Sequence, residues 1–71
     1  MVADKRQYEM IVQQVETGST AKKYFRDLWG KLIGKSQDQI IELITSGGKQ
    51  YAPIGIVIAL RLIGIVIQYR Q

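Results

Sequence analysis

Few side chains in this 71-residue sequence could do chemistry. The chain has no histidine and no cysteine, which excludes a Ser-His-Asp triad, a Cys-His pair and a zinc site built on thiolates or imidazoles. The carboxylates lie apart on polar stretches near basic residues: Asp4, Glu9, Glu16, Asp27, Asp38 and Glu42. Carboxylates in such settings are typical solvated charges. We therefore expect no enzyme, no catalytic residue, no metal site and no cofactor.

Residues that could bind an anion gather between positions 22 and 35. The expected membrane or anion contact consists of Lys22, Lys23, Arg26, Trp29, Lys31 and Lys35. On a helix this basic face lies opposite Tyr24, Phe25 and Leu28. A basic amphipathic helix can lie on an anionic membrane, and its charges can also follow nucleic-acid phosphates. A soluble helix with a charged outer face is the alternative, because Asp27 interrupts the basic patch.

The stretch Trp29-Gly30-Lys31-Leu32-Ile33-Gly34-Lys35 resembles segments of cationic leaderless bacteriocins. Those peptides are also short, rich in helix and free of cysteine. The resemblance covers one helix and implies membrane activity. The polar, charged residues 1–7 predict no Sec-type signal peptide, so we expect a cytoplasmic protein, a membrane-associated one, or one exported without a leader.

Three amphipathic helices must position these groups. Apolar residues recur at helical spacing over 4–16, 20–33 and 37–46, and each pattern predicts a helix. Gly18 and Gly34 are expected to end the first two helices. Ser36 and Gln39 have the spacing of a capping box for the third, and Gly47-Gly48 would supply its left-handed C-terminal cap.

Residues 52–68 differ in kind, because they are apolar on nearly every side. Pro53 suits the first turn of a helix. The residues around Arg61 include no turn former, so one helix is favoured over two strands. The residues expected to serve insertion or assembly are Ile54, Gly55, Ile58, Ala59, Arg61, Leu62, Ile65 and Gln68.

Three environments could bury this last helix. A helix of this length spans roughly 26 Å, just short of a ~30 Å hydrocarbon core, and Arg61 would need a partner there. In the protein's own core, a polar stripe of Arg61, Gly64 and Gln68 would face solvent. In an assembly of identical chains, Gly55 and Ala59 would let helices approach closely. The sequence leaves all three environments open.

The fold class predicted is all-α: residues 1–71 form a single small domain, with three amphipathic helices and a strongly apolar C-terminal helix. The net charge is +4, and residues 49–71 carry no acidic side chain, which favours an anionic partner. The first hypothesis is a non-enzymatic protein that associates with, or inserts into, an anionic lipid membrane. The alternatives are a coat, filament or oligomer subunit packed against copies of itself, and a helix-turn-helix module that binds nucleic acid. No small-molecule substrate is expected.

Overall fold

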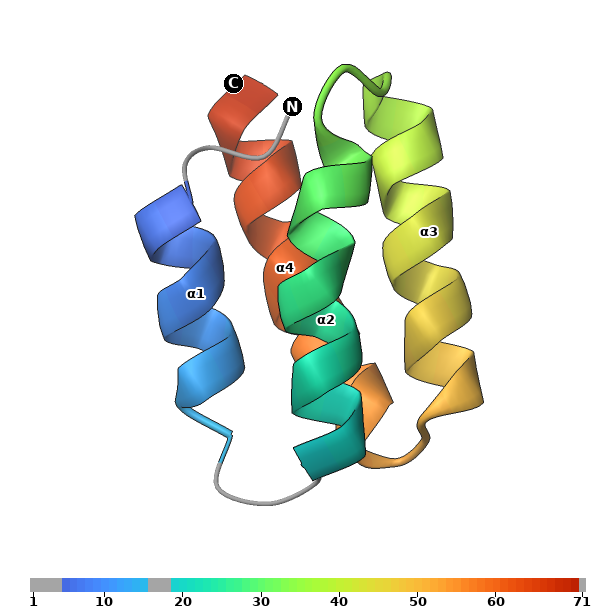
Figure 1. Cartoon of the computed structure of the whole chain (residues 1–71). Helices are drawn as coiled ribbons and strands as arrows, with labels where there is room; N and C mark the ends of the chain where they lie inside the picture. The colour runs from blue at the N-terminus through green and yellow to red at the C-terminus, as the bar shows by residue number, and fades with distance from the viewer. Residues whose placement is uncertain (1–4, 16–18, 71) are drawn as a thin grey trace.

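The computed structural model describes residues 5–15 and 19–70, with the backbone alone for Ser19 and residues 68–70. These ranges form four α-helices and no strand: α1 (Lys5–Gln13), α2 (Ser19–Leu32), α3 (Gln37–Gln50) and α4 (Ile54–Arg70). Successive helices run in opposite directions, with α2 at the front of Figure 1, α4 behind it, and α1 and α3 on either side. The predicted all-helical fold is confirmed, as is a helix rather than two strands for the C-terminal segment.

Every helix turns apolar side chains toward a common core. The buried apolar residues are Tyr8, Val12, Val15, Ala21, Phe25, Leu28, Leu32, Ile40, Ile44, Ile58, Ala59, Leu62 and Val66. Within the helices they recur every three or four residues, apart from the adjacent pair Ile58 and Ala59, as a single inward face requires. The predicted stripes of the first three helices therefore pack against one face of α4, and α3 and α4 make the most extensive contact.

Two predicted helix ends are confirmed. Before α3, the Gln39 backbone N–H donates to Ser36 Oγ at 3.3 Å and the Ser36 N–H donates to Gln39 Oε1 at 3.1 Å, which completes the capping box. After α2, Gly34 has a φ of +82°, a left-handed conformation that glycine adopts without strain. The first helix ends at Gln13, earlier than predicted, and the expected stop at Gly18 lies outside the described residues.

The predicted cap at Gly47 and Gly48 is wrong, because α3 continues through both glycines to Gln50. Each glycine is buried where another helix comes close. A Cβ on Gly48 would lie 2.8 Å from the Ala59 Cβ, and one on Gly47 would lie 2.3 Å from the Tyr24 ring. These positions lack a side chain because α2 and α4 occupy its space. The C-cap residue of the helix is Tyr51, whose N–H donates to the Gly47 carbonyl at 3.1 Å.

A buried tyrosine joins α1 to α2. The Tyr8 hydroxyl donates to the Phe25 backbone carbonyl, and the Tyr8 ring lies 5.1 Å from the Trp29 ring, between centroids, at a 58° tilt. Burial, with a smaller contribution from Tyr24, raises the pKa of the Tyr8 phenol well above its usual range. The phenol is therefore neutral and acts as a hydrogen-bond donor at ordinary pH.

Candidate functional site

The inner face of α4 is committed to the protein's own core. Gly55, Ile58, Ala59 and Leu62, all expected to serve insertion or assembly, are buried there. A Cβ on Gly55 would lie 3.0 Å from the Gly48 carbonyl oxygen. The small pair Gly55 and Ala59 thus brings α4 against α3 of the same chain. Ile54 and Ile65, from the same expected set, are half-buried at the edge of this face.

The opposite face of α4 is apolar and exposed. It carries Ile56, Val57, Leu60 and Ile67, whose exposed fractions are 44%, 45%, 67% and 44%, together with the half-buried Ile63. We call these five residues the outer stripe. Ile56, Leu60, Ile63 and Ile67 recur every three or four positions, with Val57 next to Ile56, and so the five run along one side of the helix. Exposed apolar residues gathered on one side of a helix are a candidate interaction surface.

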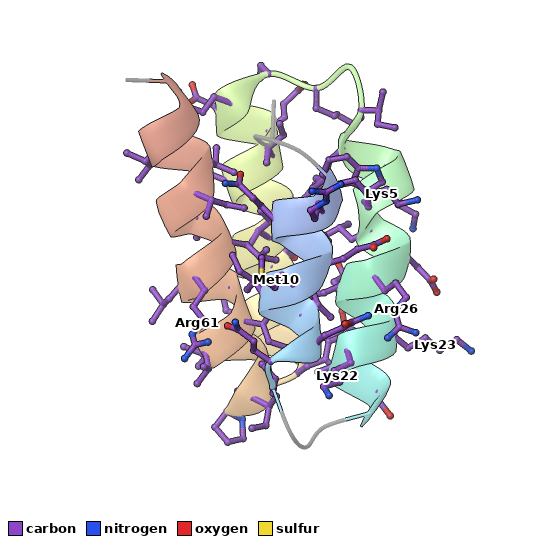
Figure 2. The ribbon with its side chains drawn as sticks, turned by 90° about the vertical axis from the view of Figure 1, so that its left-hand side faces the viewer. Lys5, Met10, Lys22, Lys23, Arg26 and Arg61 are labelled. Carbon is purple, nitrogen blue, oxygen red and sulfur yellow. The ribbon has the colours of Figure 1, made fainter. Side chains whose placement is uncertain are left out.

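The predicted polar stripe borders the outer stripe. Arg61 and Gly64 are exposed, as that prediction requires, and the side chain of Gln68 lies outside the described residues. The Arg61 guanidinium donates from Nη1 to Gln14 Oε1 at 3.2 Å, and Figure 2 shows it on the outer side of α4. This edge of the outer stripe therefore carries a permanent positive charge.

The other edge of the outer stripe is a groove between α3 and α4, with a volume of ≈ 270 Å³. From α3 it is lined by Thr45, Gly48 and Lys49, and from α4 by Ala59 and three residues of the outer stripe (Ile56, Leu60 and Ile63). Its walls are almost wholly carbon. Lys49 is exposed and has no ion-pair partner among residues 5–15 and 19–67. Cations thus flank the outer stripe on both sides, at Arg61 and at Lys49.

The expected basic face lies on another side of the molecule. Lys23, Arg26, Lys31 and Lys35 are exposed and Lys22 is half-buried. In Figure 2 the labelled side chains of α2, including Lys23 and Arg26, lie at the right and Arg61 of α4 lies at the left. In the closed bundle, one flat surface cannot contact the basic face and the outer stripe together. Trp29 is half-buried against Tyr8.

Sequence reasoning missed Ile56, Val57, Leu60 and Ile67 as surface residues. An amphipathic helix reveals its inner face through its polar residues, but α4 has very few of them. The one available signal was the stripe of Arg61 and Gly64, because residues next to it on the helix also face outward. The structure adds the orientation that α3 imposes on α4 through its close contact at Gly48.

Neither a metal site nor a membrane-spanning helix is found among residues 5–15 and 19–70. No group of three or more Asp or Glu side chains in those ranges could hold a metal ion. No helix among them has both the length and the apolar content to cross a membrane.

No protein-family model matches the chain, and comparisons with curated proteins and with solved structures find no match either.

Proposed function

We propose that this chain is a small, non-enzymatic, cationic helical protein that binds anionic lipid membranes. The observation that carries the proposal is the outer stripe of α4, an exposed apolar surface with Arg61 along one edge and Lys49 along the other. Amphipathic surfaces bind membranes when apolar side chains enter the headgroup boundary and basic side chains reach the anionic headgroups. Both components are present on this side of the molecule.

The charge distribution favours lipid as the partner of the outer stripe. Residues 49–71 carry Lys49, Arg61 and Arg70 and no acidic side chain. Each Lys or Arg near an anionic membrane contributes about 1 kcal/mol to binding. Burying an exposed leucine such as Leu60 adds roughly 1.5–3 kcal/mol at most. A few such groups together give a weak, reversible and salt-sensitive association.

The basic face of α2 plays a secondary part in this orientation. The bundle measures 30 × 21 × 19 Å, whereas the Debye length is about 10 Å at 0.1 M salt. Charges on the side of α2 away from α4 are therefore largely screened from a membrane at the outer stripe. They attract the protein toward the surface at low salt and contribute little once it has bound.

Sedimentation with lipid vesicles tests the proposal. The chain is expected to sediment with vesicles that contain phosphatidylglycerol, less so as salt is raised, and weakly with pure phosphatidylcholine. Leu60→Gln should weaken the partition by about tenfold, because it removes the most exposed side chain of the stripe. Ile33→Gln is the matched control: Ile33 is 63% exposed but lies outside α4, so the partition should not change. Equal partition of the wild type and Leu60→Gln would refute this surface as the contact.

A second function, self-assembly through α4, is favoured by one observation. Ile56, Leu60, Ile63 and Ile67 follow one another at intervals of four, three and four residues, the seam spacing of a coiled coil. Against this, two copies of the chain repel, since each carries a net charge of +4. Analytical ultracentrifugation without lipid separates the two functions. A wild-type dimer that the Leu60→Gln substitution dissociates would support assembly. A wild-type monomer would refute assembly and favour lipid as the partner of the outer stripe.

A further inference from the structure

We infer that the groove between α3 and α4 binds the hydrocarbon chain of a medium-chain fatty-acid anion, with the carboxylate at the rim of the groove beside Lys49. This inference names the lipid chemistry that the proposed membrane-binding face takes, and in that sense rests on the proposed function. It concerns a single amphiphile molecule in a defined groove.

The groove offers room and walls for one alkyl chain. Its volume of ≈ 270 Å³ lies just below the range of about 300–1,000 Å³ that is usual for ligand sites, so it suits one slender chain rather than a two-chain lipid. Gly48 and Ala59, where α3 and α4 come into close contact, form the floor of the groove. Ile56, Leu60 and Ile63 supply the apolar walls.

The one cation in the lining of the groove selects an anionic head. The walls are almost wholly carbon, so the polar head of a ligand would lie at the rim, where Lys49 is exposed. A lysine ammonium at the rim can donate to a carboxylate there. No carboxylate side chain lines the groove, so nothing there competes for Lys49.

Two other hollows on the described surface have a different character. One, between α2 and Tyr51, holds Asp27 beside Lys23 and Lys31. The other, along α3, holds Glu42 beside Lys35. Each of them is lined by a carboxylate as well as by cations, and polar side chains interrupt the walls. Charge complementarity and apolar walls occur together only in the groove at Lys49, among the hollows described here.

The test is a titration of the full chain with decanoate below its micelle concentration. Isothermal titration calorimetry would give the affinity, and NMR of labelled Ile and Leu methyl groups would locate the ligand. We expect shifts at Ile56, Leu60 and Ile63, and affinity that rises from butanoate to octanoate to decanoate. Decyltrimethylammonium, with the same tail and a cationic head, should bind several-fold more weakly.

Substitutions at Lys49 test the head group. Lys49→Gln should weaken decanoate binding by up to about fivefold, the usual strength of an exposed ion pair, and Lys49→Arg should retain it. Lys23→Gln is the matched control on α2 and should bind as the wild type does. An unchanged affinity in Lys49→Gln, or shifts confined to residues outside the groove, would overturn the inference.

The vesicle assay separates the two proposals. A chain that partitions into vesicles but does not bind monomeric decanoate would refute the groove as a fatty-acid site and leave membrane binding standing. A chain that binds decanoate in a Lys49-dependent manner but ignores vesicles would support the groove and refute the proposed function.

Discussion

Single residues in this molecule have roles that depend on what surrounds them. Tyr8 shows this most clearly: it is fully buried, yet its hydroxyl is satisfied because it reaches the Phe25 carbonyl on the neighbouring helix. A buried hydroxyl without such a partner would cost about 1–3 kcal/mol. The aromatic contact with Trp29 holds the ring in place. One side chain thus fixes the position of the short helix α1 against α2.

Tyr8 also predicts a pH dependence of stability. Because burial raises the pKa of this phenol above its unfolded value of about 10, its contribution is fully present below pH 10 and is lost as the pH rises further. Tyr8→Phe keeps the ring and removes the hydroxyl. At pH 8 the free energy of unfolding of this variant should be about 1 kcal/mol lower than that of the wild type.

Urea denaturation at pH 8 and at pH 11 measures this effect. The difference between the wild type and Tyr8→Phe should shrink or reverse at pH 11, because the variant has no phenol to ionise at this position. If the difference in unfolding free energy were the same at both pH values, the pKa of the Tyr8 phenol would not differ between the folded and unfolded states.

At the scale of the helices, the sequence predicted which elements form and was less able to predict how they meet. Apolar periodicity, the capping box at Ser36 and the stop at Gly34 are local signals, and the structure confirms them. The prediction of a C-terminal cap at Gly47 and Gly48 is wrong because glycine has two structural roles. It can adopt a left-handed conformation, or it can let another helix come close, and only the tertiary contact decides between them.

The orientation of α4 could not be predicted for a related reason. Its apolar residues surround the helix, so they do not reveal which side faces inward. The expected site residues therefore mixed buried positions such as Ile58 and Leu62 with the exposed Arg61. The outer stripe became visible only once α3 had been placed against Gly55 and Ala59.

The close contact between α3 and α4 predicts the effect of adding one methyl group. Gly48→Ala would place its Cβ 2.8 Å from the Ala59 Cβ and 3.1 Å from the Gly55 carbonyl oxygen, and neither neighbour is a flexible side-chain end. We expect a loss of about 1–3 kcal/mol in unfolding free energy, only partly offset by the higher helix propensity of alanine.

Gly30→Ala is the control for this substitution. Gly30 lies exposed within α2, and a Cβ there would have no atom within 4 Å. The unfolding free energy of this variant should be roughly 0.5–1 kcal/mol higher than that of the wild type. In thermal unfolding, the midpoint of Gly30→Ala should therefore rise and that of Gly48→Ala should fall. If Gly48→Ala were as stable as Gly30→Ala, the helices would have to lie further apart than described.

At the scale of the whole molecule, the basic face of α2 and the outer stripe of α4, with its own flanking cations, lie on different sides. The double variant Lys49→Gln/Arg61→Gln removes the cations that flank the outer stripe. Since each contributes about 1 kcal/mol near an anionic surface, we expect it to weaken partition into phosphatidylglycerol vesicles by roughly thirtyfold at 0.1 M salt.

The double variant Lys23→Gln/Arg26→Gln has the same net charge and removes cations from α2 instead. Because screening limits their reach, we expect a loss of less than about threefold in the same vesicle assay. If this variant lost more than the first, the membrane would contact the basic face of α2, and the orientation proposed here would be reversed.

The two apolar sides of α4 have a consequence for how deeply the protein could enter a lipid bilayer. Hydrocarbon tails solvate isoleucine and leucine about as well as neighbouring side chains do, so the apolar side chains of α4 would lose little by exchanging their neighbours for lipid, whereas Arg61 would oppose entry. The other three helices have no such alternative, because each has one apolar face and a charged exterior. If the outer stripe binds a membrane as proposed, the contact of these helices with α4, which is closest at Gly48, therefore determines whether the bundle stays closed at the lipid surface.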